Sequence, residues 1–66
     1  MRVRPRNDFK MLGTGIHVSK DKIYNAFPAT NQPNWESRGL VFIINAEGDT
    51  TELGFLLDST DYEVIE

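Results

Sequence analysis

The sequence lacks cysteine, which excludes disulfide frameworks, thiolate metal sites and cysteine nucleophiles. It also lacks long apolar runs, since the longest, residues 40–44, is far shorter than the roughly 20 residues that cross a bilayer. No basic segment followed by an apolar stretch opens the chain, so no secretory signal is visible. We therefore expect a water-soluble, cytoplasmic protein that does not bind membranes.

Basic residues are absent from the second part of the chain. Residues 1–38 hold all seven Lys and Arg with three acids, a net charge of +4, whereas residues 39–66 hold seven acids and no base, a net charge of −7. In a chain of 66 residues this asymmetry predicts that the two parts pair across one sheet. We expect one domain over residues 1–66, with marginal stability or dimerisation because no disulfide stabilises it.

Helical periodicity is missing too, because no window carries an apolar stripe at i, i+3, i+4 and i+7. Short alternating or β-branched runs instead predict strands. We expect strands at residues 2–4, 22–30, 40–45, 50–57 and 62–65. Proline donates no hydrogen bond to a sheet, so Pro5 restricts the first strand to an edge or ends it early. Between the strands we expect a long structured loop at 7–21 that Leu12, Ile16 and Val18 anchor to the core, a polar surface loop at 31–39, a tight reversal at 46–49 and a short 3₁₀ turn at 58–61.

This order of elements resembles the small barrels of the Src-homology-3 (SH3) type. Residues 54–64 carry the best local likeness: a glycine-bearing strand, a brief turn and a tyrosine that opens the last strand. The resemblance implies an all-β, five-stranded SH3-like barrel. Peptide-binding members begin their third strand with tryptophan and have proline in the short turn, but this chain has Gly39 and Leu40 at the first place and Leu57 or Asp58 at the second. Recognition of proline-rich peptides is therefore not carried over, and the chain is more similar to uncharacterised small barrels of bacteria and their phages.

Residues suited to catalysis are scarce. His17 has no cysteine with which to form a metal or nucleophilic pair, and it is expected to face solvent between Ile16 and Val18. The Gly-Thr-Gly stretch at 13–15 lacks the later residues of a phosphate loop, and the acids at 47, 49 and 52 match no calcium-loop spacing. We expect no enzyme activity, no cofactor and no metal.

Aromatic and apolar residues point instead to a binding surface. If Val41 and Ile43 fill the barrel, then Leu40, Phe42 and Ile44 face outward and need a cover. Tryptophan is enriched at binding hot spots, and Trp35 stands alone in a polar loop, either as a contact residue or as a lid on the core. The expected contact residues are Trp35, Phe42, Phe27 and Tyr24, with Arg38 and Glu36 as a polar rim.

The expected function is that of a non-catalytic protein-binding module, whose partner is another protein or a second copy of the chain. One such role is that of a phage or mobile-element accessory that binds or inhibits a host protein. The alternative is a nucleic-acid-binding barrel in which Arg2, Arg4, Arg6 and Lys10 contact phosphates. Pairing of these arginines with Glu63 or Glu66 on the last strand competes with that alternative.

Overall fold

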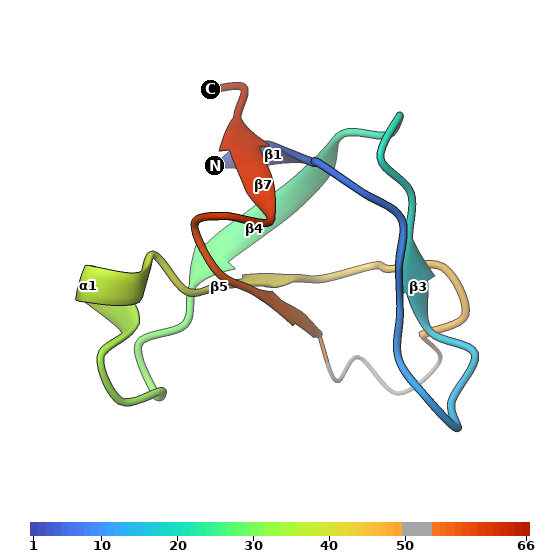
Figure 1. The fold of residues 1–66 in the computed structure, drawn as a ribbon, viewed down its shortest axis with the longest axis horizontal. Helices are drawn as coiled ribbons and strands as arrows, with labels where there is room; N and C mark the ends of the chain where they lie inside the picture. Colours follow the sequence, from blue (N-terminus) through green and yellow to red (C-terminus); the bar gives the residue numbers. More distant parts are fainter. Residues whose placement is uncertain (50–53) are drawn as a thin grey trace.

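A computed structural model describes residues 1–49 and 54–66 of the chain. Strands dominate this part, and the helix is a single turn (Figure 1). The elements are β1 (Arg2–Pro5), β2 (Phe9–Lys10), β3 (His17–Val18), β4 (Tyr24–Pro28), α1 (Trp35–Arg38), β5 (Val41–Ile43), β6 (Phe55–Leu57) and β7 (Tyr62–Val64). The expected dominance of β structure is confirmed.

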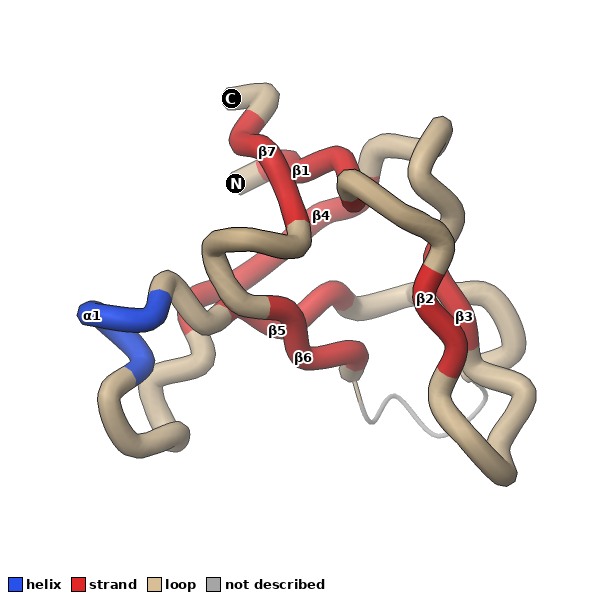
Figure 2. Tube along the Cα trace, in the orientation of Figure 1, coloured by secondary structure: helices blue, strands red, loops and turns tan. Residues whose placement is uncertain are grey.

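Five of the strands form one antiparallel sheet in the order β6-β5-β4-β1-β7. The sheet curls, and the hairpin of β2 and β3 forms a separate small sheet beside it (Figure 2). The hairpin and α1 lie at opposite ends of the longest dimension of the molecule, while both termini lie together beside β1 and β7 (Figure 1).

Strand β1 shows how the alternating sequence produces this sheet. Val3 and Pro5 are buried, whereas Arg2 and Arg4 between them are exposed, as the two-residue period of a strand requires. Of the two effects expected of Pro5, an edge position or an early end of the strand, the structure shows the early end, because β1 lies between β4 and β7 and stops at Pro5. Proline is accommodated because Pro5 is the last residue of β1.

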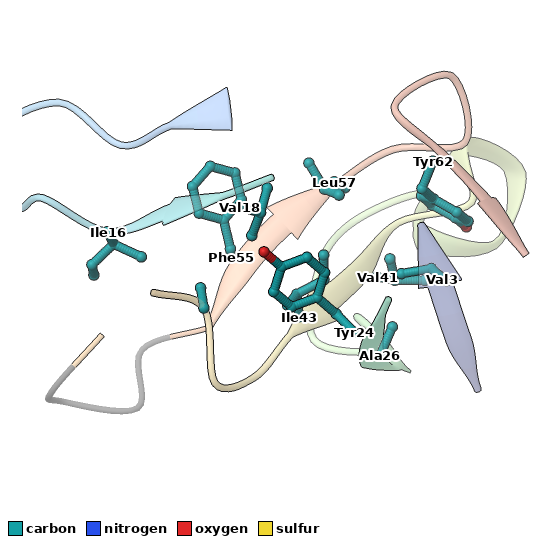
Figure 3. Close-up of a cluster of buried hydrophobic side chains, with 11 residues drawn as sticks. Val3, Ile16, Val18, Tyr24, Ala26, Val41, Ile43, Phe55, Leu57 and Tyr62 are labelled. Carbon is teal, nitrogen blue, oxygen red and sulfur yellow. The ribbon is translucent and has the colours of Figure 1, made fainter. Parts of the chain in front are cut away.

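The core fills the concave side of the curled sheet (Figure 3). Val3, Ala26 and Ile43 are completely buried there, and Val18 from the hairpin packs with them. Burial of such side chains supplies the main stabilisation of a domain that has no covalent cross-link. The hairpin is therefore part of the core.

The hairpin was expected only as a long loop held by apolar residues. Ile16 and Val18 are buried as expected, but Leu12 is 91% exposed and contributes nothing to the core. The tip of the hairpin is held by residues 46–48: His17 and Glu47 exchange two backbone hydrogen bonds, of 2.9 and 3.0 Å. Gly48 has a φ of +79°, which suits the reversal expected at 46–49.

The short turn expected at 58–61 is present, closed by a 2.9 Å bond from Asp61 N–H to Asp58 O with the i to i+3 spacing of a 3₁₀ turn. Two other expectations differ from the structure. Leu40 is only 4% exposed, because it precedes β5 and follows the left-handed Gly39, so the alternation of the strand does not reach it. The polar loop at 31–39 includes α1, and residues 50–53 of the expected fourth strand lie outside the described residues.

Across the described ranges 1–49 and 54–66, no helix is long and apolar enough to cross a membrane.

The contact between the hairpin tip and the 46–49 turn predicts different costs for two glycine substitutions. Gly13 and Gly48 both have positive φ, so an alanine at either place costs about 1 kcal/mol of backbone strain. A Cβ at Gly48 would also lie 2.6 Å from Gly15 O, whereas one at Gly13 would meet nothing within 4 Å. We expect Gly48→Ala to lower the free energy of unfolding by about 2 kcal/mol or more and Gly13→Ala by about half as much, measured by urea denaturation. Equal losses would contradict this packing.

Candidate functional site

The outer face of β4, β5 and β6 carries a row of apolar side chains. The strand register places Phe42 opposite Phe27 on one side and opposite Leu56 on the other. Because neighbouring residues alternate between faces, all three point away from the core that holds Ile43 and Leu57. Phe27 is 52% exposed and Leu56 is 40% exposed, and we call these three residues the outer apolar row.

Phe42 is the best-fixed member of this row. Its ring covers the backbone at Gly54, where an added Cβ would lie 3.3 Å from Phe42 Cδ1. Gly54 has a φ of +81°, so glycine fits this place for both its conformation and its lack of a side chain. Phe42 is thus half-buried although it faces outward.

Helix α1 lies at the end of the β4–β5 pair and carries three of the expected contact residues. Trp35 is half-buried, whereas Glu36 and Arg38 are exposed. Two bonds tie this segment to the turn before β7: Ser59 N–H donates to Arg38 O at 3.0 Å, and the Tyr62 hydroxyl donates to Gly39 O at 2.7 Å. The rim residues are therefore presented on a segment that is fixed at its C-terminal end.

Tyr24 does not lie on the expected contact surface, because its side chain is buried and only 8% exposed. It stands three residues before Phe27, and an odd spacing places two residues on opposite faces of a strand. Its hydroxyl oxygen accepts a bond from Ser19 N–H at 2.9 Å and donates to Glu47 Oε2 at 2.7 Å. Burial raises the pKa of Tyr24, so the hydroxyl stays protonated and serves as a structural donor.

Glu47 joins the hairpin region to β4. Its carboxylate accepts hydrogen bonds from the Tyr24 hydroxyl and from Lys22 Nζ, the latter at 2.5 Å. Partial burial acts to raise the pKa of Glu47, but the bonds from Lys22 and Tyr24 outweigh it and hold this pKa below its ordinary value. Glu47 is therefore a structural anion.

The basic residues of β1 are engaged with the last strand. Arg4 Nη1 lies 3.1 Å from Glu63 Oε1, and Arg2 forms an ion pair with Glu66, so the expected cross-strand pairing is confirmed. Arg6 and Lys10 are exposed and form no ion pair with any residue that the structure describes. A shallow depression of about 400 Å³ is lined by Arg4, Pro5, Arg6, Lys20, Asp21 and Glu63. The acids beside its bases make it a mixed-charge surface.

Polar side chains of the hairpin region line a depression of about 420 Å³, which is bounded by Asp8, Phe9, Lys10, His17, Val18 and Ser19. The exposed His17 ring bonds the backbone two residues before it, with Nδ1 3.0 Å from Gly15 O. Among residues 1–49 and 54–66, no three His, Asp or Glu side chains stand close enough to hold a metal ion. The outer apolar row with α1 is accordingly the candidate site.

Leu56 is the site residue that the sequence analysis missed. Phe55, Leu56 and Leu57 are all apolar, so the sequence contains no alternation that tells the inner face from the outer. Pairing with the expected strand at 40–45 could have shown which face Leu56 occupies, because the residue paired with an outward-facing Phe42 must also face outward. Such an argument needs the register of the hairpin, which the turn length leaves open.

The chain matches no protein-family model, and neither a curated protein nor a solved structure is detectably similar to it.

The Glu47 contacts predict a pH-dependent contribution to stability. The pKa of Glu47 is lower in the folded chain than its unfolded value of about 4.3, so the carboxylate stabilises the fold above that pH, and this contribution is lost as the pH falls through the folded value. We expect Glu47→Gln to lower the free energy of unfolding by about 1–2 kcal/mol at neutral pH. In urea denaturation the gap between wild type and variant should close below about pH 4. A gap that stays constant under acid would contradict this role.

Proposed function

We propose that this chain is a non-catalytic protein-binding module whose contact surface is the outer apolar row beside α1. The observation that carries the proposal is the exposure of Phe27 and Leu56 on either side of the fixed Phe42 ring. Contiguous exposed apolar side chains on a small domain mark interaction sites, because burying them on a partner removes them from water.

Helix α1 carries the charged residues that the outer apolar row lacks. In this proposal the half-buried Trp35 of α1 adds aromatic area to the surface, and the exposed Glu36 and Arg38 supply charges of both signs at its margin. Interfaces commonly combine an apolar centre with such a polar rim. Tyr24 is not part of the proposed surface, since its ring belongs to the core.

The proposed fold is an SH3-like barrel. The strand order β6-β5-β4-β1-β7, a hairpin in the first long connection and a short turn before the last strand all support this assignment. On the resemblance to small barrels of bacteria and phages, we also propose that the partner is a host protein and the chain a phage or mobile-element accessory.

Nucleic-acid binding through Arg2, Arg4, Arg6 and Lys10 is the weaker alternative. Arg2 and Arg4 would have to exchange Glu66 and Glu63 for phosphates, at a surface that keeps these carboxylates close by. The net charge of −3 also opposes the approach of a polyanion.

The proposed surface is tested by affinity capture from a lysate with immobilised wild-type protein and two matched variants. Phe27→Thr removes an aromatic ring from the row but places a β-branched, strand-favouring residue in β4, whereas Leu12→Thr removes a 91% exposed side chain at the far hairpin. We expect Phe27→Thr to weaken the captured interaction at least about tenfold, with Leu12→Thr unchanged. Trp35→Ala should also weaken capture while the melting temperature stays nearly constant.

Equal capture by the wild type and Phe27→Thr would contradict the proposed surface. A large loss of stability in Trp35→Ala with intact capture would make Trp35 a lid on the core instead of a contact residue.

A further inference from the structure

Strand β7 forms one edge of the five-stranded sheet. It has β1 on one side and no strand of the described part of the chain on the other. The backbone bonds toward β1 come from alternate residues, since Asp61 O accepts one and Ile65 N–H donates one, each of 2.8 Å. Tyr62 and Val64 stand at the alternate positions, so their N–H and C=O groups point away from β1, to the open side.

These groups are unpaired, unlike those at the other edge of the sheet. At β6 the N–H groups of Gly54 and Asp58 donate to carboxylates, at 3.1 and 3.2 Å. Within residues 1–49 and 54–66, no hydrogen bond is formed by the N–H of Tyr62 or of Val64. Each of these two residues therefore offers one donor and one acceptor to a further strand.

The side chains of β7 show what such a strand would meet. Val64 lies opposite the buried Val3, on the face that holds the core, and is 58% exposed at the margin of that face. Glu63 lies opposite Arg4 on the other face, with Oε1 3.1 Å from Arg4 Nη1 and a side chain that is 45% exposed. An added strand thus meets an apolar side chain on one face and a carboxylate on the other.

Strand β1 shows which sequence complements β7. Residues 2–4 read Arg-Val-Arg, and the two arginines form ion pairs with Glu66 and Glu63 while Val3 lies opposite Val64. From this precedent we infer that the open side of β7 binds an extended segment of another protein, in which basic and apolar residues alternate. This surface lies on a different strand from the outer apolar row, so it adds a second contact to the proposed module.

The acid on this edge selects the partner. A charge on an edge strand discourages pairing with a strand of like charge, whereas opposite charges on neighbouring strands stabilise the pair. Glu63 meets a base on its inner side, and its exposed part can meet a second one on the open side. A second copy of the chain is a poor occupant, because pairing β7 with β7 brings the acids of both strands together, where they repel.

A β-bulge limits the length of the added strand. The N–H groups of Ile65 and Glu66 both donate to Arg2 O, at 2.8 and 3.4 Å, so two residues stand opposite one. The regular part of the edge therefore ends at Val64. A base opposite Glu63 with an apolar residue on each side of it matches the segment from Tyr62 to Val64. In such strand addition the main-chain bonds supply affinity and the alternate side chains supply specificity.

The probe is the capped peptide Thr-Lys-Val-Lys-Val-Lys-Thr, which presents the same alternation in either strand direction. Binding is followed by amide chemical-shift changes in the full-length, isotope-labelled protein. We expect the largest changes at Tyr62, Glu63 and Val64, and small ones in the outer apolar row. Thr-Val-Lys-Lys-Lys-Val-Thr has the same composition without the alternation, and a third peptide carries Glu in place of Lys. Both should bind at least about tenfold more weakly than the alternating peptide.

Two N-methylated forms of the alternating peptide separate strand pairing from side-chain contact alone. One is methylated at both Val residues, whose N–H groups point to β7 in an antiparallel arrangement. The other is methylated at the central Lys, whose N–H points to β7 in a parallel arrangement. One form should therefore keep the affinity of the parent peptide, and the other should lose at least about tenfold.

Three variants of the protein test the same edge. Glu63→Gln should weaken binding of the alternating peptide at least about fivefold, whereas Glu36→Gln, which removes an equal charge from α1, should not. Val64→Pro removes an N–H on the open side without removing a bond to β1, so it should abolish binding while the urea midpoint stays close to that of the wild type.

The inference is overturned by equal affinities of the two methylated forms, by equal binding of the rearranged or the Glu peptide, by shifts that leave β7 unaffected, or by absence of binding. Undiminished binding to a folded Val64→Pro variant, or a dimer in solution that pairs through β7, would overturn it as well. None of these outcomes affects the proposed contact row, because Phe27→Thr and capture from a lysate report on β4 and its neighbours.

Discussion

The register between β4, β5 and β6 is the constraint on which the rest of this structure depends. Side chains alternate along a strand, so the pairing that buries Ile43 necessarily turns Phe42 outward, against Phe27 and Leu56. A slip of one residue in β5 would exchange the two faces and place the Phe42 ring in the core. Gly54 suits the observed register, because it places no side chain against that ring, where a Cβ would lie only 3.3 Å from Phe42 Cδ1.

The basic first part and the acidic second part of the sequence form ion pairs with each other in the fold. Arg4 pairs with Glu63 across β1 and β7, and Lys22 pairs with Glu47 near β4. Exposed ion pairs add little to stability. Their main consequence is that they neutralise some charged side chains and leave others unneutralised at particular places on the surface. Bases without an ion pair among the described residues include Arg6, whereas β6 is followed directly by the acidic Asp58. The apolar strand β6 is thus followed by negative charge.

Much of this architecture could be predicted from the sequence, because the strands alternate or are bounded by turn residues. The pairing of the arginines of β1 with the last strand also followed from charge alone. The face of Leu56 could not be predicted, since Phe55 and Leu57 are equally apolar. The prediction that Tyr24 lies on the contact surface is wrong, because its odd spacing from Phe27 puts the two rings on opposite faces of β4. The β2–β3 hairpin escaped detection because strands of two residues are too short to show a period.

The central claim is that the outer apolar row is exposed and shared by three neighbouring strands. It is tested most directly by nuclear Overhauser effects between side chains, combined with broadening by a soluble paramagnetic chelate. The account predicts contacts from Phe42 to both Phe27 and Leu56, with strong broadening of Phe27 and Leu56 and little of Tyr24 and Phe55. The account would be contradicted by contacts between the Phe42 ring and the core residues around Ile43, or by a Phe27 side chain that the chelate does not broaden in the monomer.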